Sequence, residues 1–184
     1  MSKPLTAGEF LIRTATSSDS KILSGLSQTT FYQTYVAIHP ENAGLLRAYT
    51  EETFSEEKIQ RQSQLPAVYY YVVESGDVVL GYMKTVRGDA PDQVLQKPSL
   101  ELEKLYVKGE FQGRGLGQKL FDFLIPVALA SGHRSIWLSV YENNPGAIAF
   151  YRKNGFRVVG EKDFVYSWNG TEYRDRDKLM EFVF

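Results

Sequence analysis

The first 66 residues predict one short strand followed by helices. Residues 10–14 (FLIRT) are apolar and β-favouring. From Thr16 onward, capping residues precede apolar residues at helical spacing, which predicts a helix; these are Ile22, Leu23, Leu26, Phe31 and Tyr35. Residues 41–62 continue as an acidic helix that we expect to be broken.

The middle of the chain predicts three strands and a glycine-rich loop. Residues 67–87 contain two β-favouring runs around Gly76-Asp77, which is typical of a hairpin. A loop should span residues 88–99. Residues 100–107 (LELEKLYV) predict a strand, and the glycine-rich loop follows it directly.

The C-terminal third predicts two helices, one strand and a hairpin. A helical stripe of apolar residues begins at Leu116 and ends at Gly132, and Pro126 inside it should remove one backbone hydrogen bond and kink the helix. Residues 135–141 (SIWLSVY) predict a strand. A short helix has Asn144 as N-cap, Pro145 at its first position and Gly155 as its stop. A hairpin around Asn169-Gly170 should end the chain.

Composition narrows the class of protein. A chain of 184 residues with 43% hydrophobic and 14% aromatic residues is globular and long enough for one domain, so we expect a single domain over residues 1–184. It contains no cysteine, which excludes disulfides, thiolate metal sites and a cysteine nucleophile. The two histidines, His39 and His133, are far apart in the sequence, so we expect no metal site.

The net charge and the hydropathy of the chain indicate which partners it can bind and in which compartment we expect it. A net charge of −1 argues against a general nucleic-acid binder. No apolar run reaches the ~18 residues that a membrane span needs, and the first ten residues (MSKPLTAGEF) lack an apolar signal segment. We therefore expect a cytoplasmic protein without membrane or nucleic-acid partners.

The loop at residues 110–120 (EFQGRGLGQKL) has a glycine at every second position from 113 to 117. Glycines let backbone N–H groups approach an anion, and the N-terminus of the following helix adds its dipole. This predicts a phosphate site, although a glycine-rich turn without a ligand remains an alternative.

Three familiar phosphate motifs do not fit this loop. A dinucleotide fingerprint would require glycine where Gln118 stands, and a Walker loop would require Lys and Ser or Thr directly after Gly117. A protein kinase would require H-R-D, whereas the chain has His133-Arg134-Ser135.

The remaining pattern, Q-x-x-G-x-G from Gln112 to Gly117, resembles a known family. The segments LEKLYVKGEFQGRGLGQKL and IWLSVYENNPGAIAFYRKNGF resemble the two acetyl-CoA segments of the GNAT superfamily of N-acetyltransferases. The order of predicted elements also matches, so the resemblance covers nearly the whole chain. The segment ENNPGAIAFYRKNGF and the acidic helices after AIHPEN look most like bacterial polyamine N-acetyltransferases.

The resemblance implies an α/β (α+β) fold with a mixed, mostly antiparallel central sheet and helices on both faces. In this family the middle strands part, and the pantetheine arm of acetyl-CoA lies in the gap. The implied cosubstrate is acetyl-CoA, without a metal, and the implied acceptor is a small amine such as a polyamine. The sequence leaves a homodimer open.

The resemblance also implies which residues bind acetyl-CoA. Leu105, Tyr106 and Val107 should contact the pantetheine arm through their backbone. The backbone of Val107 should also stabilise the carbonyl oxygen of the thioester. The pyrophosphate loop comprises Gln112, Gly113, Arg114, Gly115, Leu116, Gly117 and Gln118. The second segment contributes Asn144, Ala147, Tyr151 and Lys153. For Lys153 a solvated surface position is an equal alternative, and Lys119 fits the helix surface.

Acetyl transfer to an amine requires the amine to lose a proton. At pH 7 only about one primary amine in 10^3.4 is neutral, which corresponds to roughly 4.6 kcal/mol, so a carboxylate base is useful. Glu101 and Glu103 should alternate onto the strand face that also carries Leu105 and Val107. The resemblance places a base on this strand but leaves both glutamates open, and an exposed charged strand face is the alternative.

The departing thiolate needs a proton, and Tyr151 is the candidate acid. It lies seven residues after Asn144, on the helix that lines the thiol end in the family. Thiol and phenol pKa values of ~8.5 and ~10 are close enough for transfer. A core tyrosine is the alternative.

Several functions remain open besides acetylation of a small cationic amine. They are a protein or peptide N-acetyltransferase, a non-catalytic acyl-CoA-binding regulator, and a phosphate-binding module without acyl chemistry. Residues 41–57 contain five glutamates, at positions 41, 51, 52, 56 and 57, against the single cation Arg47, and we expect them to collect a cationic acceptor.

Overall fold

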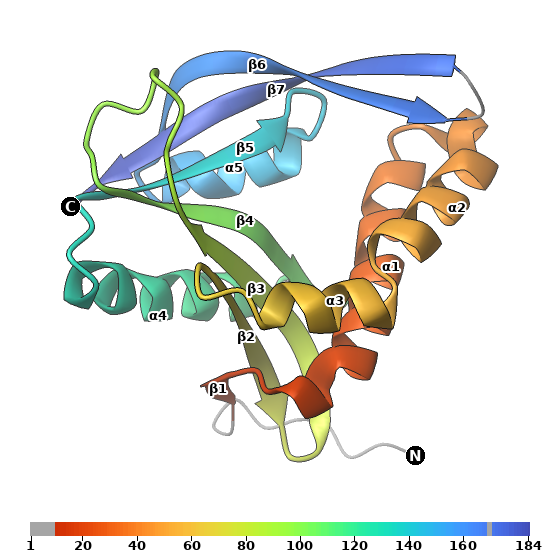
Figure 1. Ribbon diagram of the computed structural model, residues 1–184, viewed down its shortest axis with the longest axis horizontal. Coiled ribbons are helices and arrows are strands. Elements are labelled where there is room, and N and C mark those ends of the chain that lie inside the picture. The colour runs from red at the N-terminus through yellow and green to blue at the C-terminus, as the bar shows by residue number, and fades with distance from the viewer. Residues whose placement is uncertain (1–9, 169–170) are drawn as a thin grey trace. The chain divides into compact units, whose positions relative to one another are not determined.

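The computed structural model describes residues 10–168 and 171–184. Their strands hydrogen-bond in the order β1-β2-β3-β4-β5-β7-β6, and the registered pairs are antiparallel except for β4 with β5 (Figure 1). The expected mixed, mostly antiparallel sheet is confirmed. The elements are β1 (Leu11–Thr14), α1 (Ser20–Val36), α2 (Ala43–Thr53), α3 (Glu56–Ser63), β2 (Val68–Ser75), β3 (Val78–Arg87), β4 (Ser99–Val107), α4 (Leu116–Ala130), β5 (Ser135–Tyr141), α5 (Pro145–Lys153), β6 (Arg157–Trp168) and β7 (Thr171–Val183).

The chain divides into two compact units. The first comprises residues 1–85 and 104–125, and the second comprises residues 86–103 and 126–184. Strand β4 and helix α4 therefore contribute residues to both units. The single domain expected over residues 1–184 stays a prediction, and each unit is described by itself below.

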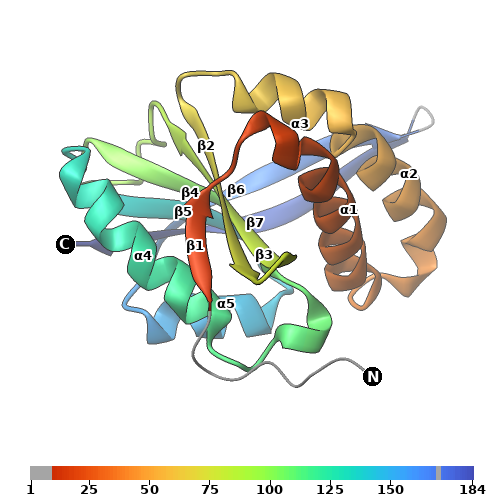
Figure 2. The same ribbon diagram turned by 90° about the horizontal axis from the view of Figure 1, so that it is seen from below.

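In the first unit, helices cover both faces of β2. Tyr70 and Val72 pack with side chains of α1 and α3, among them Leu23 and Ile59. Tyr71 points to the opposite face, because side chains alternate along a strand. There its ring meets Phe123 of α4 edge-on, with centroids 5.4 Å apart. Figure 2 shows α3 and α4 on opposite sides of β2. The expectation of helices on both faces is confirmed.

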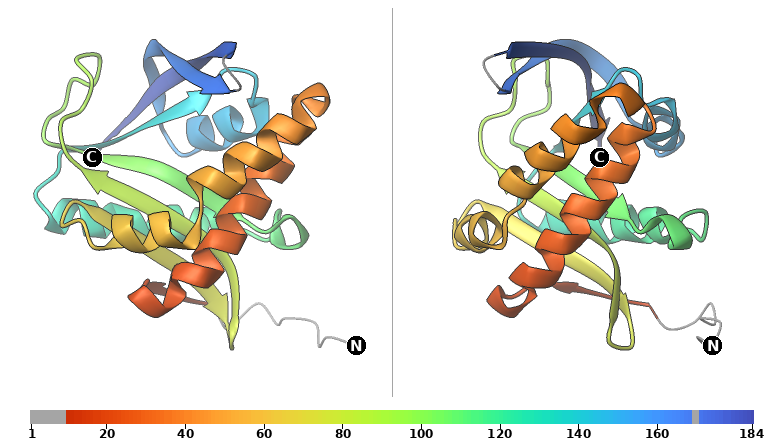
Figure 3. Two further views of the ribbon diagram at one scale, coloured as in Figure 1. Left: turned by 45° about the vertical axis from the view of Figure 1, so that its right-hand side comes forward. Right: turned by 90° about the vertical axis from the view of Figure 1, so that its right-hand side faces the viewer.

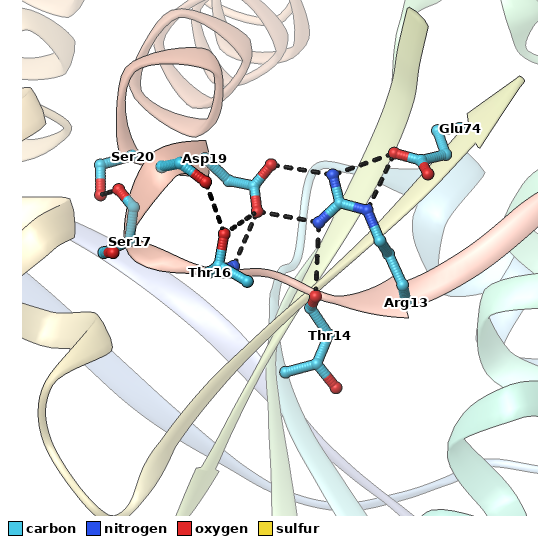
Figure 4. Close-up of polar contacts among 8 residues, drawn as sticks. Arg13, Thr14, Thr16, Ser17, Asp19, Ser20 and Glu74 are labelled. Atoms are coloured by element: carbon cyan, nitrogen blue, oxygen red, sulfur yellow. Dashed lines mark hydrogen bonds and ion pairs between the residues drawn. The ribbon is translucent and has the colours of Figure 1, made fainter. Parts of the chain in front are cut away.

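A partly buried ion pair fixes the start of α1 to the neighbouring strands. Arg13 of β1 donates two hydrogen bonds to the Asp19 carboxylate, at 2.8 and 2.9 Å, and a third to Glu74 of β2 at 3.0 Å (Figure 4). The Thr16 backbone N–H donates to the same Asp19 carboxylate at 2.7 Å. Chiefly through the hydrogen bonds from Arg13, the pKa of Asp19 is lowered to about 2.

The acidic segment is helical and broken, as expected. Helices α1 and α2 lie side by side (Figure 3). The break between α2 and α3 falls at Phe54, which is buried, and at Ser55, whose hydroxyl accepts a hydrogen bond from the Lys58 N–H at 3.4 Å. Ser55 is therefore the N-cap of α3.

In the second unit, β5 pairs with β7 along its whole length and β7 continues into a hairpin with β6. Trp137 and Leu179 pack under Val94 of the loop between β3 and β4. The buried Glu181 carboxylate fixes this loop by accepting hydrogen bonds from the backbone of Leu95 and Gln96 at 3.3 and 2.9 Å.

Three further predictions about helices, strands and turns can be compared with the structure. The turn at Gly76-Asp77 and the strand over residues 135–141 are confirmed. Helix α4 continues through Pro126 to Ala130. The turn expected at Asn169-Gly170 lies outside the described residues, as does most of the N-terminal segment. Within the described part of the chain, no helix is long and apolar enough to cross a membrane.

Candidate active site

The glycine loop lies in the first unit, between the end of β4 and the start of α4. Gly113 and Gly115 have φ values of +73° and +79°, a region that L side chains rarely adopt. No described heavy atom lies within 4 Å of a Cβ atom built at either residue. The backbone conformation, rather than packing within the chain, therefore demands these two glycines, and both are exposed.

Gln112 ties this loop to the strand that precedes it. Its side-chain Nε2 donates a hydrogen bond to the Val107 carbonyl oxygen at 3.0 Å. The N–H of Lys108 in turn donates to the Leu80 carbonyl of β3 at 2.9 Å. Gln112 thus has a structural role that the sequence did not reveal, and its contact with a cofactor stays a prediction.

The other side chains of the loop lie in three different environments: the core, the surface of α4 and the solvent. Leu116 is buried in the core, so only its backbone is suited to meet a cofactor. Gln118 donates to Asp122 at 2.8 Å along the exposed side of α4. Arg114 is exposed, and its guanidinium carbon lies 5.3 Å from the centre of the Phe111 ring. Arg114 and Lys119 are the cationic side chains of this loop.

The last residues of β4 have their side chains engaged within the first unit. The Tyr106 side chain is partly buried and packs against the core cluster that contains Tyr82, and the two ring centroids lie 5.9 Å apart. Only the Tyr106 backbone is therefore suited to a cofactor contact. A Cβ atom on Gly81 of β3 would lie 2.6 Å from the Tyr106 carbonyl oxygen, so glycine is required for the close approach of these strands. Gly81 was not among the residues predicted from the sequence.

The two candidate bases lie on the part of β4 that belongs to the second unit. Glu101 is registered opposite Trp137 of β5, and the registered pairs between these parallel strands end there. Strand β5 nevertheless continues to Tyr141, paired with β7. Glu101 and Glu103 are both half-buried and, by alternation, share one strand face. The end of the β4–β5 register is consistent with strands that part beyond this point.

Helix α5 begins as its sequence predicts. The Asn144 side-chain oxygen accepts a hydrogen bond from the Ala147 N–H at 3.1 Å, which confirms Asn144 as the N-cap. Pro145 follows at the first helical position. Gly155, with a φ of +90°, lies just beyond the helix end at Asn154. Lys153 is exposed in the last turn.

Tyr151 has a buried ring in the last turn of α5. Only 9% of the residue is exposed, and its ring meets those of Phe150 and Phe156 at centroid distances of 5.3 and 5.4 Å. Its hydroxyl forms no hydrogen bond within the part of the chain that the structure describes. Burial raises the pKa of this phenol above its ordinary value of 10. The hydroxyl is therefore protonated at neutral pH, as a general acid must be, but it is a weaker acid than ordinary pKa values indicate.

The acidic helices contain more local pairing than their sequence suggested. Glu52 pairs with Lys58 at 3.4 Å and Glu57 with Arg61 at 2.6 Å, and both cations lie just beyond residues 41–57, the range in which the glutamates were counted. Glu41 lies 3.1 Å from the ring nitrogen of His39. The expected excess of five glutamates over one cation is therefore smaller in the structure, because Lys58 and Arg61 neutralise two of the five carboxylates. Glu51 and Glu56 are exposed, with no partner among the described residues.

The chemistry of these groups suits an anionic cofactor and gives no grouping for a metal. Across residues 10–168 and 171–184, no three His, Asp or Glu residues are grouped closely enough to hold a metal ion. The positive-φ glycines, the exposed loop backbone and the Arg114 guanidinium fit a phosphate group.

Comparison with known proteins identifies relatives of the chain. A family model described as "Acetyltransferase (GNAT) family" matches residues 34–156. An uncharacterized N-acetyltransferase of Lactobacillus delbrueckii subsp. lactis is 30% identical over 141 residues, which span 76% of this chain and 80% of that protein.

Two further relatives differ in their acceptors. The spermine/spermidine N(1)-acetyltransferase of Bacillus subtilis is 39% identical over 64 residues, 34% of this chain and 42% of that enzyme. The N-alpha-acetyltransferase RimI of Mycobacterium tuberculosis is 29% identical over 113 residues, 61% of this chain and 66% of that enzyme.

Solved structures share the fold at low identity. The PaiA N-acetyltransferase of Thermoplasma acidophilum in complex with coenzyme A has a TM-score of 0.74 and 20% identity, over 96% of this chain and 99% of that one. The spermidine N-acetyltransferase of Vibrio cholerae in complex with CoA and spermine has a TM-score of 0.68 and 19% identity, over 95% of each chain.

Proposed function

Since this chain belongs to the GNAT family of acetyltransferases and is an acetyl-CoA-dependent N-acetyltransferase, we propose that its acceptor is a polyamine or another small cationic amine. We further propose the direct route, in which both substrates are bound together. The thioester supplies the acetyl group. The ammonium group first loses one proton. The neutral amine then forms the bond to the acetyl carbon and loses a second proton, while the bond from that carbon to sulfur breaks and the departing thiolate gains one proton.

The glycine loop is the proposed site of the CoA pyrophosphate. Gly113 and Gly115 adopt left-handed φ values that leave the loop backbone exposed, with no described atom where a Cβ would stand. Anions are favoured at such a backbone in front of a helix N-terminus. This conformation is the single observation that best supports the cofactor assignment. Arg114 adds a guanidinium that matches a phosphate in shape and charge.

Proton transfer is assigned to the second unit. We assign the proton from the amine to a carboxylate of β4, Glu103 or Glu101, reached directly or through water. We assign the proton for the thiolate to the Tyr151 hydroxyl, which is protonated at neutral pH as any phenol is and whose pKa burial raises further. No covalent nucleophile is required, which agrees with a chain that lacks cysteine.

The acceptor assignment rests on charge. The N-terminal helices display Glu51 and Glu56 without a partner among the described residues, next to glutamates that are already ion-paired. Each unpaired carboxylate facing a polyamine contributes on the order of 1 kcal/mol in partial solvent, and salt screens it beyond ~8 Å. The similarity to a spermine/spermidine enzyme supports the same class of acceptor.

A peptide or protein amine is the second candidate. It is favoured by the similarity to an N-alpha-acetyltransferase, which covers more of this chain than the similarity to the polyamine enzyme does. The two candidates differ in the charge of the acceptor, and this difference can be measured.

The test is an acceptor screen that follows thiol release and confirms the acetylated product by mass spectrometry. Spermidine, spermine, a monoamine and short peptides with free N-termini would be compared. We expect polyamines to give the highest kcat/KM, and their KM to rise with ionic strength.

Paired variants then test the role of charge. Neutralising Glu51 and Glu56 together to Gln should raise the KM for spermidine more than the KM for the monoamine. Glu57→Gln is the matched control, because Glu57 is already paired with Arg61. Preferred acetylation of the peptides, or a spermidine KM indifferent to salt and to the double substitution, would exclude the polyamine assignment.

A further inference from the structure

The aromatic ring of Phe111 lies beneath the charged side chain of the glycine loop. The Arg114 guanidinium carbon is 5.3 Å from the ring centre, within the range of a cation–π contact. We infer that Phe111 is a positioning residue, which holds the Arg114 guanidinium ready to bind the pyrophosphate of CoA. This inference rests on the cofactor site proposed above and concerns two side chains of the first unit.

The backbone around Arg114 explains why such a contact is useful. Arg114 stands between Gly113 and Gly115, so a side chain with many rotamers is carried by a segment with unusual backbone freedom. An unrestrained guanidinium in this place would lose much conformational entropy on binding a phosphate. A contact that restricts it beforehand reduces that loss.

The ring itself is carried by a well-fixed segment. The Phe111 N–H donates to the Lys108 carbonyl at 2.9 Å, within the turn that follows β4. Directly after it, Gln112 is held to Val107 by its side chain. Phe111 is half-buried, whereas Arg114 is exposed. The ring on the anchored segment can therefore restrict the rotamers of the exposed Arg114 side chain.

A guanidinium held over an aromatic ring keeps its hydrogen-bond donors available. A contact with a ring face uses the plane of the guanidinium, while its N–H groups point outward along the edges. Arg114 forms no ion pair or hydrogen bond with the described residues, so its donors are not used within that part of the chain. Two parallel N–H donors match two oxygens of a phosphate. Lys119, in the first turn of α4, provides only a point charge.

A double-mutant cycle tests the inference by calorimetric binding of CoA and of dephospho-CoA, which lacks the 3′-phosphate. We expect Arg114→Gln to weaken CoA binding about tenfold and Phe111→Leu to weaken it about two- to fivefold. The double variant should bind no more weakly than Arg114→Gln alone. The same coupling should appear with dephospho-CoA.

Two controls separate positioning from packing. Phe111→Trp should retain wild-type CoA affinity or exceed it, because indole binds cations better than phenyl, whereas a ring needed only for apolar packing would be replaced better by Leu. Lys119→Ala combined with Phe111→Leu should give additive losses. Urea unfolding of each variant would verify that it is folded.

Each contrary outcome has a defined meaning. Equal losses from Phe111→Leu in the wild-type and Arg114→Gln backgrounds would overturn the positioning role. Coupling that disappears with dephospho-CoA would assign Arg114 to the 3′-phosphate and overturn the pyrophosphate assignment. A wild-type protein that does not bind CoA would instead refute the proposed cofactor site, and the positioning role with it.

Discussion

Replacing Gly115 by alanine should separate the demands of folding from those of cofactor binding. Gly115 has a φ of +79°, and no described heavy atom lies within 4 Å of its Cβ position. Alanine therefore meets no clash in the chain, but it must adopt a left-handed conformation. That strain is about 1 kcal/mol, which for a chain of this size lowers the Tm by about 2–4 °C.

Gly132, just after α4, offers a matched control. Its φ is +80°, and the space around its Cβ position is equally open among the described residues. Gly132→Ala should therefore reduce stability by the same amount. It lies outside the glycine loop, so CoA affinity should not change.

The cofactor assay then distinguishes the two positions. In Gly115→Ala the new methyl group stands on the backbone that the pyrophosphate must approach, so we expect CoA affinity to fall at least tenfold, on the order of 1.4 kcal/mol. Calorimetry with CoA and thermal unfolding would be run on both variants. Equal CoA affinities for the folded Gly115→Ala and Gly132→Ala proteins would refute the assignment of this loop to the pyrophosphate.

The remaining predictions concern proton transfer and the stability of the fold. Tyr151→Phe should lower kcat by a factor of ~10²–10⁴ without weakening CoA binding. Because burial raises the pKa of the phenol, any fall of kcat with rising pH that occurs below pH 10 should persist in the variant. A variant with wild-type kcat would remove Tyr151 from the mechanism. Glu103→Gln should depress kcat/KM most at low pH, where neutral amine is scarcest, whereas the same pH dependence in Glu101→Gln alone would exchange the two roles. Asp19→Asn should reduce the free energy of unfolding by about 2 kcal/mol at pH 7, since Arg13 and its neighbours lower the pKa of Asp19 from 3.8 to about 2. The lowered pKa stabilises the fold above about pH 4, so urea unfolding should show this difference shrinking as the pH falls towards 2, and a difference that stays constant with pH would contradict the ion-pair explanation.

Local signals in the sequence determined most of the secondary structure. Asn144, Pro145 and Gly155 predicted both ends of α5, because capping and chain reversal depend on residues within a few positions of each other. The hairpin turn at Gly76-Asp77 and the break between α2 and α3 were predictable for the same reason. The glycine spacing between 113 and 117 likewise predicted a loop between a strand and a helix, and Gly113 and Gly115 in it adopt positive φ values.

Contacts between residues distant in sequence were decided only by the tertiary structure. The requirement for glycine at position 81 could not be predicted from the sequence, because the atom that excludes a side chain is the Tyr106 carbonyl oxygen on another strand. The function of Glu181 as an acceptor for the Leu95 and Gln96 backbone was equally hidden, since the partners lie more than 80 residues apart.

The candidate site shows the same division. Its residue types and motif spacing could be identified from the sequence, because an anion needs glycines and a cation at short range along the chain. The effect of burial on the pKa of Tyr151, the pairing of Glu52 with Lys58 and the stacking of Arg114 on Phe111 could not be identified in that way. Burial and side-chain contact depend on how the chain packs around each group, and packing is set by the fold as a whole.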